Sequence, residues 1–175
     1  MAPSGSCTHQ VRFNLDAVEQ TDEVRRVRAR TFELVEFLHD ILKADAFPWA
    51  EFPHKVVLHS NCQALRGLGI ASMSELRAEP FSKLANLLSK VKGIEFVHLA
   101  RPDECCGFGG TFSVFEEGVS SKMGHDKVLD QHQFGAEYVT SSDSSCMMHQ
   151  QGCAERLGMP QKYIRIAQIL NGARS

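Results

Sequence analysis

The 175-residue sequence has no apolar stretch that approaches the ~20 residues needed to cross a bilayer, and its first residues contain no apolar core of a signal peptide. It also has no excess of basic charge, since the formal net charge is −2. The one basic run, residues 25–30, is typical of the solvated face of a polar helix. These absences predict a cytoplasmic protein without a membrane span or a nucleic-acid partner.

Two common cofactor and metal motifs are missing as well. The only glycine-rich stretch, Gly107-Phe108-Gly109-Gly110, does not have the G-x-G-x-x-G spacing of a dinucleotide site, which argues against direct nicotinamide or flavin binding. No short Cys-x2-Cys pair is present, so the sequence is not that of a zinc ribbon.

What the sequence does contain is an adjacent pair of cysteines, Cys105 and Cys106. Neighbouring Cα atoms lie about 3.8 Å apart, less than the ~4.4–6.8 Å usual for a disulfide. Two thiolates in contact would repel by roughly 4 kcal/mol in a protein-like dielectric. A metal ion or an iron–sulfur cluster removes both difficulties, because it binds deprotonated sulfur and supplies positive charge.

Two further cysteines flank this pair in the pattern C-x42-CC-x39-C, Cys62 before it and Cys146 after it. In a chain without a secretion signal, such thiols more often bind metal or take part in redox chemistry than form disulfides. We therefore expect four sulfurs to meet at one point. Buried, inert thiols are the alternative, and we expect that role for Cys153 within a helix.

Hydrophobic periodicity predicts an α/β fold, with a mostly parallel sheet of about four strands flanked by helices and an N-terminal helical extension. Each of the first three predicted strands is followed by one of the cysteine turns, and the carboxyl ends of parallel strands share one edge of a sheet. Residues 1–7 are predicted to be a loop. The predicted strands are 55–59, 95–99, 136–140 and 163–166, and the predicted helices are 21–42, 74–91, 115–131 and 147–157, with a helical turn near Leu170.

Three segments resemble the cysteine-rich CCG-domain family: HSNC at 59–62, DECCGFGGTFS at 103–113 and DSSCMM at 143–148. The resemblance implies a [4Fe-4S]-type cluster held by Cys62, Cys105, Cys106 and Cys146. It also implies two domains, with 54–175 as the CCG domain and 1–53 as the tail of a preceding half-domain, a helix and a connector. Residues 3–7 resemble the end of a first CCG half whose own CCG is absent from this sequence, so Cys7 is expected to lie outside the site.

The same resemblance suggests residues that surround a cluster. Gly107, Gly109 and Gly110 would let backbone amides point at its sulfur atoms. His59 is either such a neighbour or an ordinary core histidine. The fuller family motif ends in Cys-x-x-Cys, whereas here His149 takes the last position, either as a substitute ligand or only as a neighbour.

The implied function is that of an iron–sulfur oxidoreductase subunit, which relays electrons in the oxidation of L-lactate or a related 2-hydroxy acid within a multi-subunit complex. The alternative is a non-catalytic interaction module whose cysteine site holds zinc or no metal. The substrate and the electron acceptor stay open at this point.

Overall fold

The computed structural model describes residues 1–172 and confirms the predicted α/β class. Its centre is a four-stranded sheet in the order β2-β1-β3-β4, and all neighbouring strands run parallel. The strands are β1 (Lys55–Leu58), β2 (Glu95–Val97), β3 (Tyr138–Ser141) and β4 (Lys162–Arg165).

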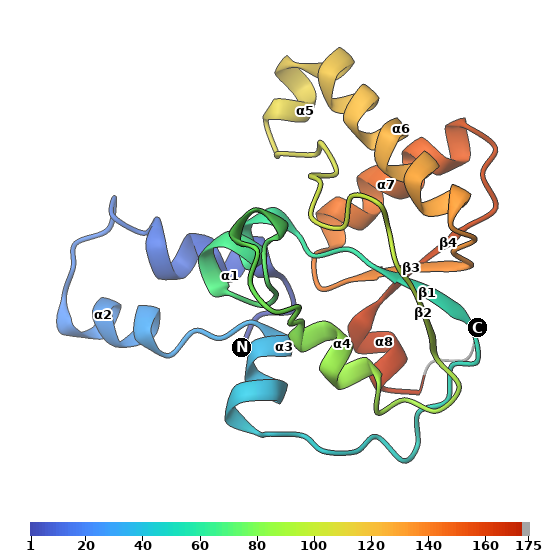
Figure 1. Ribbon diagram of the computed structural model, residues 1–175. Coiled ribbons are helices and arrows are strands. Elements are labelled where there is room, and N and C mark those ends of the chain that lie inside the picture. The colour runs from blue at the N-terminus through green and yellow to red at the C-terminus, as the bar shows by residue number, and fades with distance from the viewer. Residues whose placement is uncertain (173–175) are drawn as a thin grey trace.

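Helices cover both faces of this sheet, as Figure 1 shows, with α6 and α7 on one face and α4 and α8 on the other. Two π-helical segments, Phe37–Ile41 and Ala64–Leu68, and one 3-10 turn, Ser74–Leu76, complete the described elements. The helices are α1 (Gly5–Phe13), α2 (Asp22–Ala29), α3 (Leu34–Glu36), α4 (Lys83–Leu88), α5 (Phe112–Phe115), α6 (Glu117–Gln133), α7 (Ser144–Arg156) and α8 (Ile166–Leu170).

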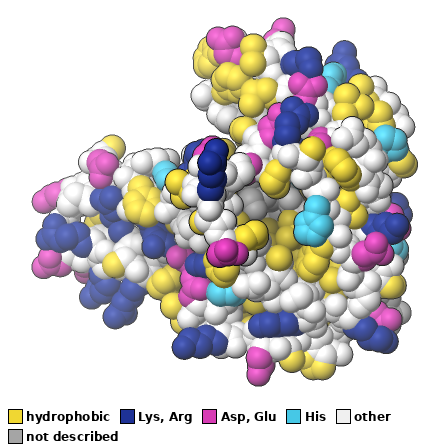
Figure 2. All heavy atoms as spheres, viewed as in Figure 1, with side chains coloured by type: hydrophobic (Ala, Val, Ile, Leu, Met, Phe, Trp, Pro, Cys, Tyr) yellow, Lys and Arg dark blue, Asp and Glu magenta, His cyan; other side chains and the backbone are white. Residues whose placement is uncertain are grey.

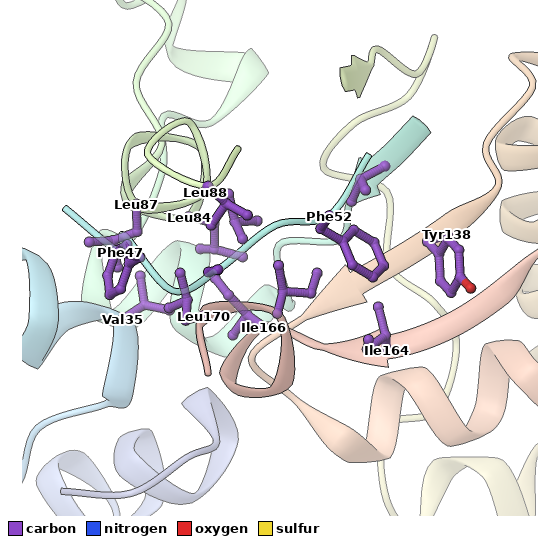
Figure 3. Close-up of a cluster of buried hydrophobic side chains, with 14 of the residues drawn as sticks. Val35, Phe47, Phe52, Leu84, Leu87, Leu88, Tyr138, Ile164, Ile166 and Leu170 are labelled. Atoms are coloured by element: carbon purple, nitrogen blue, oxygen red, sulfur yellow. The ribbon is translucent and has the colours of Figure 1, made fainter. Parts of the chain in front are cut away.

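The hydrophobic core has a part on each side of the sheet because strand residues alternate in direction. Val56 of β1 packs into the larger part, and Val57 packs with Val139 on the opposite face. Val56 and Val57 are both fully buried, which is typical of a parallel sheet covered on two sides. The larger part, drawn in Figure 3, includes Val35, Phe47, Phe52, Leu84, Leu87, Leu88, Tyr138, Ile164, Ile166 and Leu170.

Residues before the sheet share this core, since Val35 and Phe47 pack against α4 and α8. Each such side chain contributes roughly 1.5–3 kcal/mol by leaving water. A boundary between residues 53 and 54 stays a prediction. Among residues 1–172, no helix combines the length and the apolar character that a bilayer crossing requires.

The N-terminal predictions were partly wrong. Residues 5–7 are not a loop, because α1 begins at Gly5. The helix predicted over 21–42 is interrupted after Ala29, where extended backbone pairs with Ala2: the Ala2 N–H donates to the Phe32 carbonyl at 2.8 Å. Helix α3 then begins directly after Glu33, whose carboxylate accepts hydrogen bonds from the Val35 and Glu36 amides.

Three later helix boundaries also differ from the predictions. Helix α4 begins only after Ser82, which caps it by accepting from the Ala85 amide, so most of the segment 74–82 is not helical. The helix predicted over 115–131 is divided at Glu116 into α5 and α6. Helix α7 begins at Ser144, three residues earlier than predicted, and this places Cys146 in its first turn.

Candidate metal centre

The three cysteine segments meet at the carboxyl edge of strands β2, β1 and β3, which are neighbours in the sheet. Cys62 lies four residues after the end of β1, Cys105 and Cys106 follow β2, and Cys146 lies in the first turn of α7 directly after β3. The Sγ atoms of Cys106 and Cys146 and a ring nitrogen of His59 all lie within 4.8 Å of one another.

The four thiols form a chain of neighbours in the order Cys62, Cys105, Cys106, Cys146, and their pKa values alternate along it. Contact with the Cys106 and Cys62 thiols lowers the pKa of Cys105. Contact with Cys106, helped by the nearby His59 ring and opposed by burial, lowers the pKa of Cys146. The pKa values of Cys62 and Cys106 are raised by contact with neighbouring thiols and by burial.

This alternation has a simple chemical meaning. Two protonated thiols stabilise two thiolates, and further ionisation would place like charges side by side in a poorly solvated place. A bound cation replaces the shared protons and allows all four sulfurs to ionise. The donor set therefore fits a thiophilic metal or an iron–sulfur cluster.

The backbone after Cys106 turns through Gly107, which has φ +89°. Its N–H donates to Cys105 Sγ at 3.4 Å, and its carbonyl accepts from Ser120 Oγ at 2.8 Å. A Cβ built at this position would lie 2.6 Å from the Ser120 carbonyl oxygen and 2.7 Å from Met123 Cβ, so only glycine fits without movement. The tight packing of this turn onto α6 holds the adjacent cysteines in place.

Gly109 and Gly110 also have positive φ angles but are exposed. Their carbonyl groups accept from the Phe112 and Ser113 amides at the start of α5. A role for these two glycines toward a cluster stays a prediction.

Asp143 joins the elements around the site through one carboxylate. Oδ1 caps α7 by accepting from the Ser145 amide at 3.1 Å. Oδ2 accepts from the Ser6 amide and the Ser4 hydroxyl, both at 3.0 Å, and from Asn61 Nδ2 at 3.1 Å. Burial alone would raise the pKa of Asp143, but these hydrogen bonds outweigh burial and lower it. In the sequence, Asp143 stands out only as the first residue of the family-like segment 143–148, and nothing there indicates its contacts with the N-terminal segment.

We expect Asp143→Ala to lower the free energy of unfolding by about 2 kcal/mol at pH 7, since charged hydrogen bonds and two helix starts are lost. Because the folded pKa is depressed, the carboxylate stabilises the fold above the unfolded pKa of about 3.9 and loses this effect as pH falls through the folded value. Urea titrations at pH 7 and pH 3 measure this difference. Equal losses at both pH values would contradict it, and Asp16→Asn, at an exposed carboxylate, is the control.

Lys127 is a second residue that the sequence reasoning missed. Its side chain is fully buried, and Nζ donates to the carbonyl groups of Arg101 at 2.8 Å and Pro102 at 3.3 Å. Burial lowers the pKa of this lysine, although Glu104 nearby opposes the shift. The contact fixes the segment that leads into Cys105. Nothing in the sequence indicated that this lysine in the predicted helix 115–131 would be buried.

The remaining predicted residues lie as follows. His149 Nε2 is 3.2 Å from the Ser120 carbonyl oxygen, and its ring lies beside Phe108. Cys7 is exposed on α1, and Cys153 is buried in a small hydrophobic cluster with Val128. All six cysteines are free thiols.

Comparison with known proteins agrees with this arrangement. Residues 56–151, which include all four clustered cysteines, match the family CCG, described as a cysteine-rich domain, and the chain belongs to this family. Among curated proteins it is similar to lactate utilization protein A. It is 39% identical to that protein from Exiguobacterium sp. (strain ATCC BAA-1283 / AT1b) and 34% identical to that from Bacillus subtilis (strain 168). These alignments cover 98% of this chain and 67% and 69% of the two relatives, respectively.

Proposed function

We propose that this chain is an iron–sulfur oxidoreductase subunit that relays electrons in the oxidation of L-lactate or a related 2-hydroxy acid within a multi-subunit complex. The observation that carries the proposal is the meeting of four thiols from three separate segments at one edge of the sheet. The relatives named for lactate utilization support the substrate class.

In this proposal Cys62, Cys105, Cys106 and Cys146 hold a [4Fe-4S]-type cluster. A bound cluster supplies a centre that accepts and releases single electrons. The chain shields that centre, because Cys106 and Cys146 are buried, and directs at least the Gly107 amide toward a cysteine sulfur. Such amide contacts and exclusion of solvent are the means by which proteins tune a cluster's reduction potential.

We place oxidation of the hydroxy acid itself on a partner subunit. A cavity of about 500 Å³ extends along β1 and β2 to Asp103, and His98 lines its wall but no lysine or arginine does. A 2-hydroxy acid carries a carboxylate, which proteins usually bind with a cationic side chain. The described cavity is therefore a poor site for the substrate.

A partner subunit also accounts for an exposed apolar surface next to the cysteine loop. The side chains of Val114 and Phe115 are 72% and 81% exposed, and Val119 is 53% exposed. Figure 2 shows hydrophobic side chains gathered over α5 and the start of α6. Exposed apolar patches of this kind mark protein–protein contacts. We assign this surface to the subunit that exchanges electrons with the cluster, and we place the complex in the cytoplasm.

The purified chain, loaded with iron and sulfide, is expected to show no lactate oxidation with artificial electron acceptors. Turnover should require the subunits that accompany it. The assay compares the chain alone with the assembled complex, using dye reduction with L-lactate as substrate. Robust turnover by the chain alone would overturn the electron-relay proposal.

The alternative is a zinc-binding module without catalysis. Four thiolates, or three together with the His59 ring, would also satisfy tetrahedral Zn²⁺. The electron-relay proposal is preferred because adjacent thiols next to amide donors suit a cluster, and because the chain resembles proteins of lactate utilization. The metal and sulfide content of the purified protein decides between the two.

A further inference from the structure

His59 is a buried histidine without an ordinary structural role. It follows β1 directly. Its backbone N–H donates to the Thr140 carbonyl at 2.8 Å, which continues the pairing of β1 with β3 and fixes the backbone at this position. The residue is only 1% exposed. Neither ring nitrogen has a hydrogen bond of ordinary geometry among the described residues, although the ring lies close enough to the Cys146 thiol to help lower its pKa.

Other histidines in the chain show what a satisfied ring looks like. His54 Nδ1 lies 2.8 Å from Glu137 Oε2, and His39 Nδ1 lies 2.6 Å from Asp40 Oδ1. His149 Nε2 is 3.2 Å from a backbone carbonyl oxygen. An unpaired buried polar atom costs about 1–3 kcal/mol, so two in one ring indicate a missing partner.

The position of the ring identifies that partner. A ring nitrogen of His59 lies within 4.8 Å of the sulfur atoms of both Cys106 and Cys146, which is the spacing of donors around a common centre. We propose that His59 supplies an imidazole nitrogen as a ligand to the group that these cysteines hold. The inference rests on the proposed function, because it requires that an iron–sulfur group binds there.

Ligation accounts for the ring better than a hydrogen bond does. A neutral imidazole has one N–H and one nitrogen lone pair. When a bound metal has removed the thiol protons, the neighbouring sulfurs can accept a hydrogen bond but cannot donate one. The lone pair then needs either the metal or an extra proton, and a metal satisfies it without burying a further charge.

Nitrogen ligation would distinguish this centre from an all-cysteine one. The four cysteines already supply four thiolates, so the imidazole nitrogen would be an additional, neutral donor, and the surroundings of a cluster, its ligands included, set its reduction potential. His149 differs from His59 in this respect. It stands at the last position of the family motif, but its ring nitrogen already has a partner in the Ser120 carbonyl.

The test uses the full chain, reconstituted anaerobically with iron and sulfide and labelled with either ¹⁴N- or ¹⁵N-histidine. Pulsed electron paramagnetic resonance of the reduced protein should show a strong nitrogen coupling that changes with the isotope. His59→Asn should abolish that coupling and shift the reduction potential. His149→Asn, the matched control, should leave both unchanged.

Each outcome decides something definite. A cluster without any strong histidine coupling in the wild-type protein would overturn this inference and leave the proposed function standing, as would a coupling that persists in His59→Asn. A weak coupling alone would assign His59 as a hydrogen-bond donor and so also overturn it. Failure of the wild-type chain to take up iron and sulfide would instead overturn the proposed function. If His59→Asn does not fold, the nitrogen coupling is measured in His149→Asn instead. Loss of the coupling in that variant refutes the inference, and its retention supports the inference.

Discussion

Replacement of Cys106 by serine is expected to reduce bound iron and sulfide to less than about a tenth of the wild-type amount, because thiolate ligands dominate binding of iron–sulfur clusters. Cys106 occupies a central place in the site: it contacts Cys105 and Cys146 and lies near His59. A serine hydroxyl at this position remains protonated and binds iron poorly. The measurement is the iron and acid-labile sulfide content after anaerobic reconstitution.

The fold itself should survive this substitution. The core of the sheet and its helices does not depend on the thiol, so the metal-free variant is expected to unfold within about 1 kcal/mol of the metal-free wild-type protein. Cys7→Ser is the matched control, since Cys7 is exposed on α1, and it should keep the full iron content. Full iron content in Cys106→Ser, or its loss in Cys7→Ser, would contradict the assigned ligand set.

Gly107→Ala is expected to lower the free energy of unfolding by about 2–5 kcal/mol, the sum of an unfavourable backbone conformation and overpacking. The new Cβ would meet the Ser120 carbonyl oxygen and Met123 Cβ at well under 3 Å, and neither atom belongs to a freely movable side-chain end. Because the turn would have to leave α6, cluster content should fall as well. Urea denaturation of the metal-free protein measures the stability, and iron analysis measures the cluster.

Gly110→Ala provides the comparison within the same loop. Gly110 also has a positive φ, +64°, but a Cβ there would meet no atom within 4 Å. Its replacement should cost only about 1 kcal/mol, through the left-handed backbone alone. If the two substitutions cost the same, the close packing of Gly107 on α6 would not be what positions the cysteine pair.

The sheet and the convergence of its cysteine loops could be predicted because they depend on local patterns. Short apolar runs mark the strands, and parallel strands place their carboxyl ends together whatever the details of the helices. Helix boundaries that depend on distant partners could not be predicted in the same way. The break after Ala29 depends on pairing with Ala2, and α1 has no strong apolar stripe to reveal it.

The same distinction applies to the residues around the site. Asp143 belongs to the family-like segment 143–148, but its contact with Ser6, like the contact of Lys127 with Arg101, joins residues far apart in the sequence, so no local motif indicates these contacts. For the histidines, the motif position drew attention to His149, whereas only the three-dimensional structure shows that His59 has two unpaired nitrogens beside the thiols.

The most direct test of the central claim is the composition and visible spectrum of the wild-type chain after anaerobic reconstitution with iron, sulfide and zinc all present. The proposal predicts a brown protein with broad visible absorption and equal amounts of iron and acid-labile sulfide, as a [4Fe-4S]-type cluster requires. A colourless protein that contains zinc and no sulfide would contradict it.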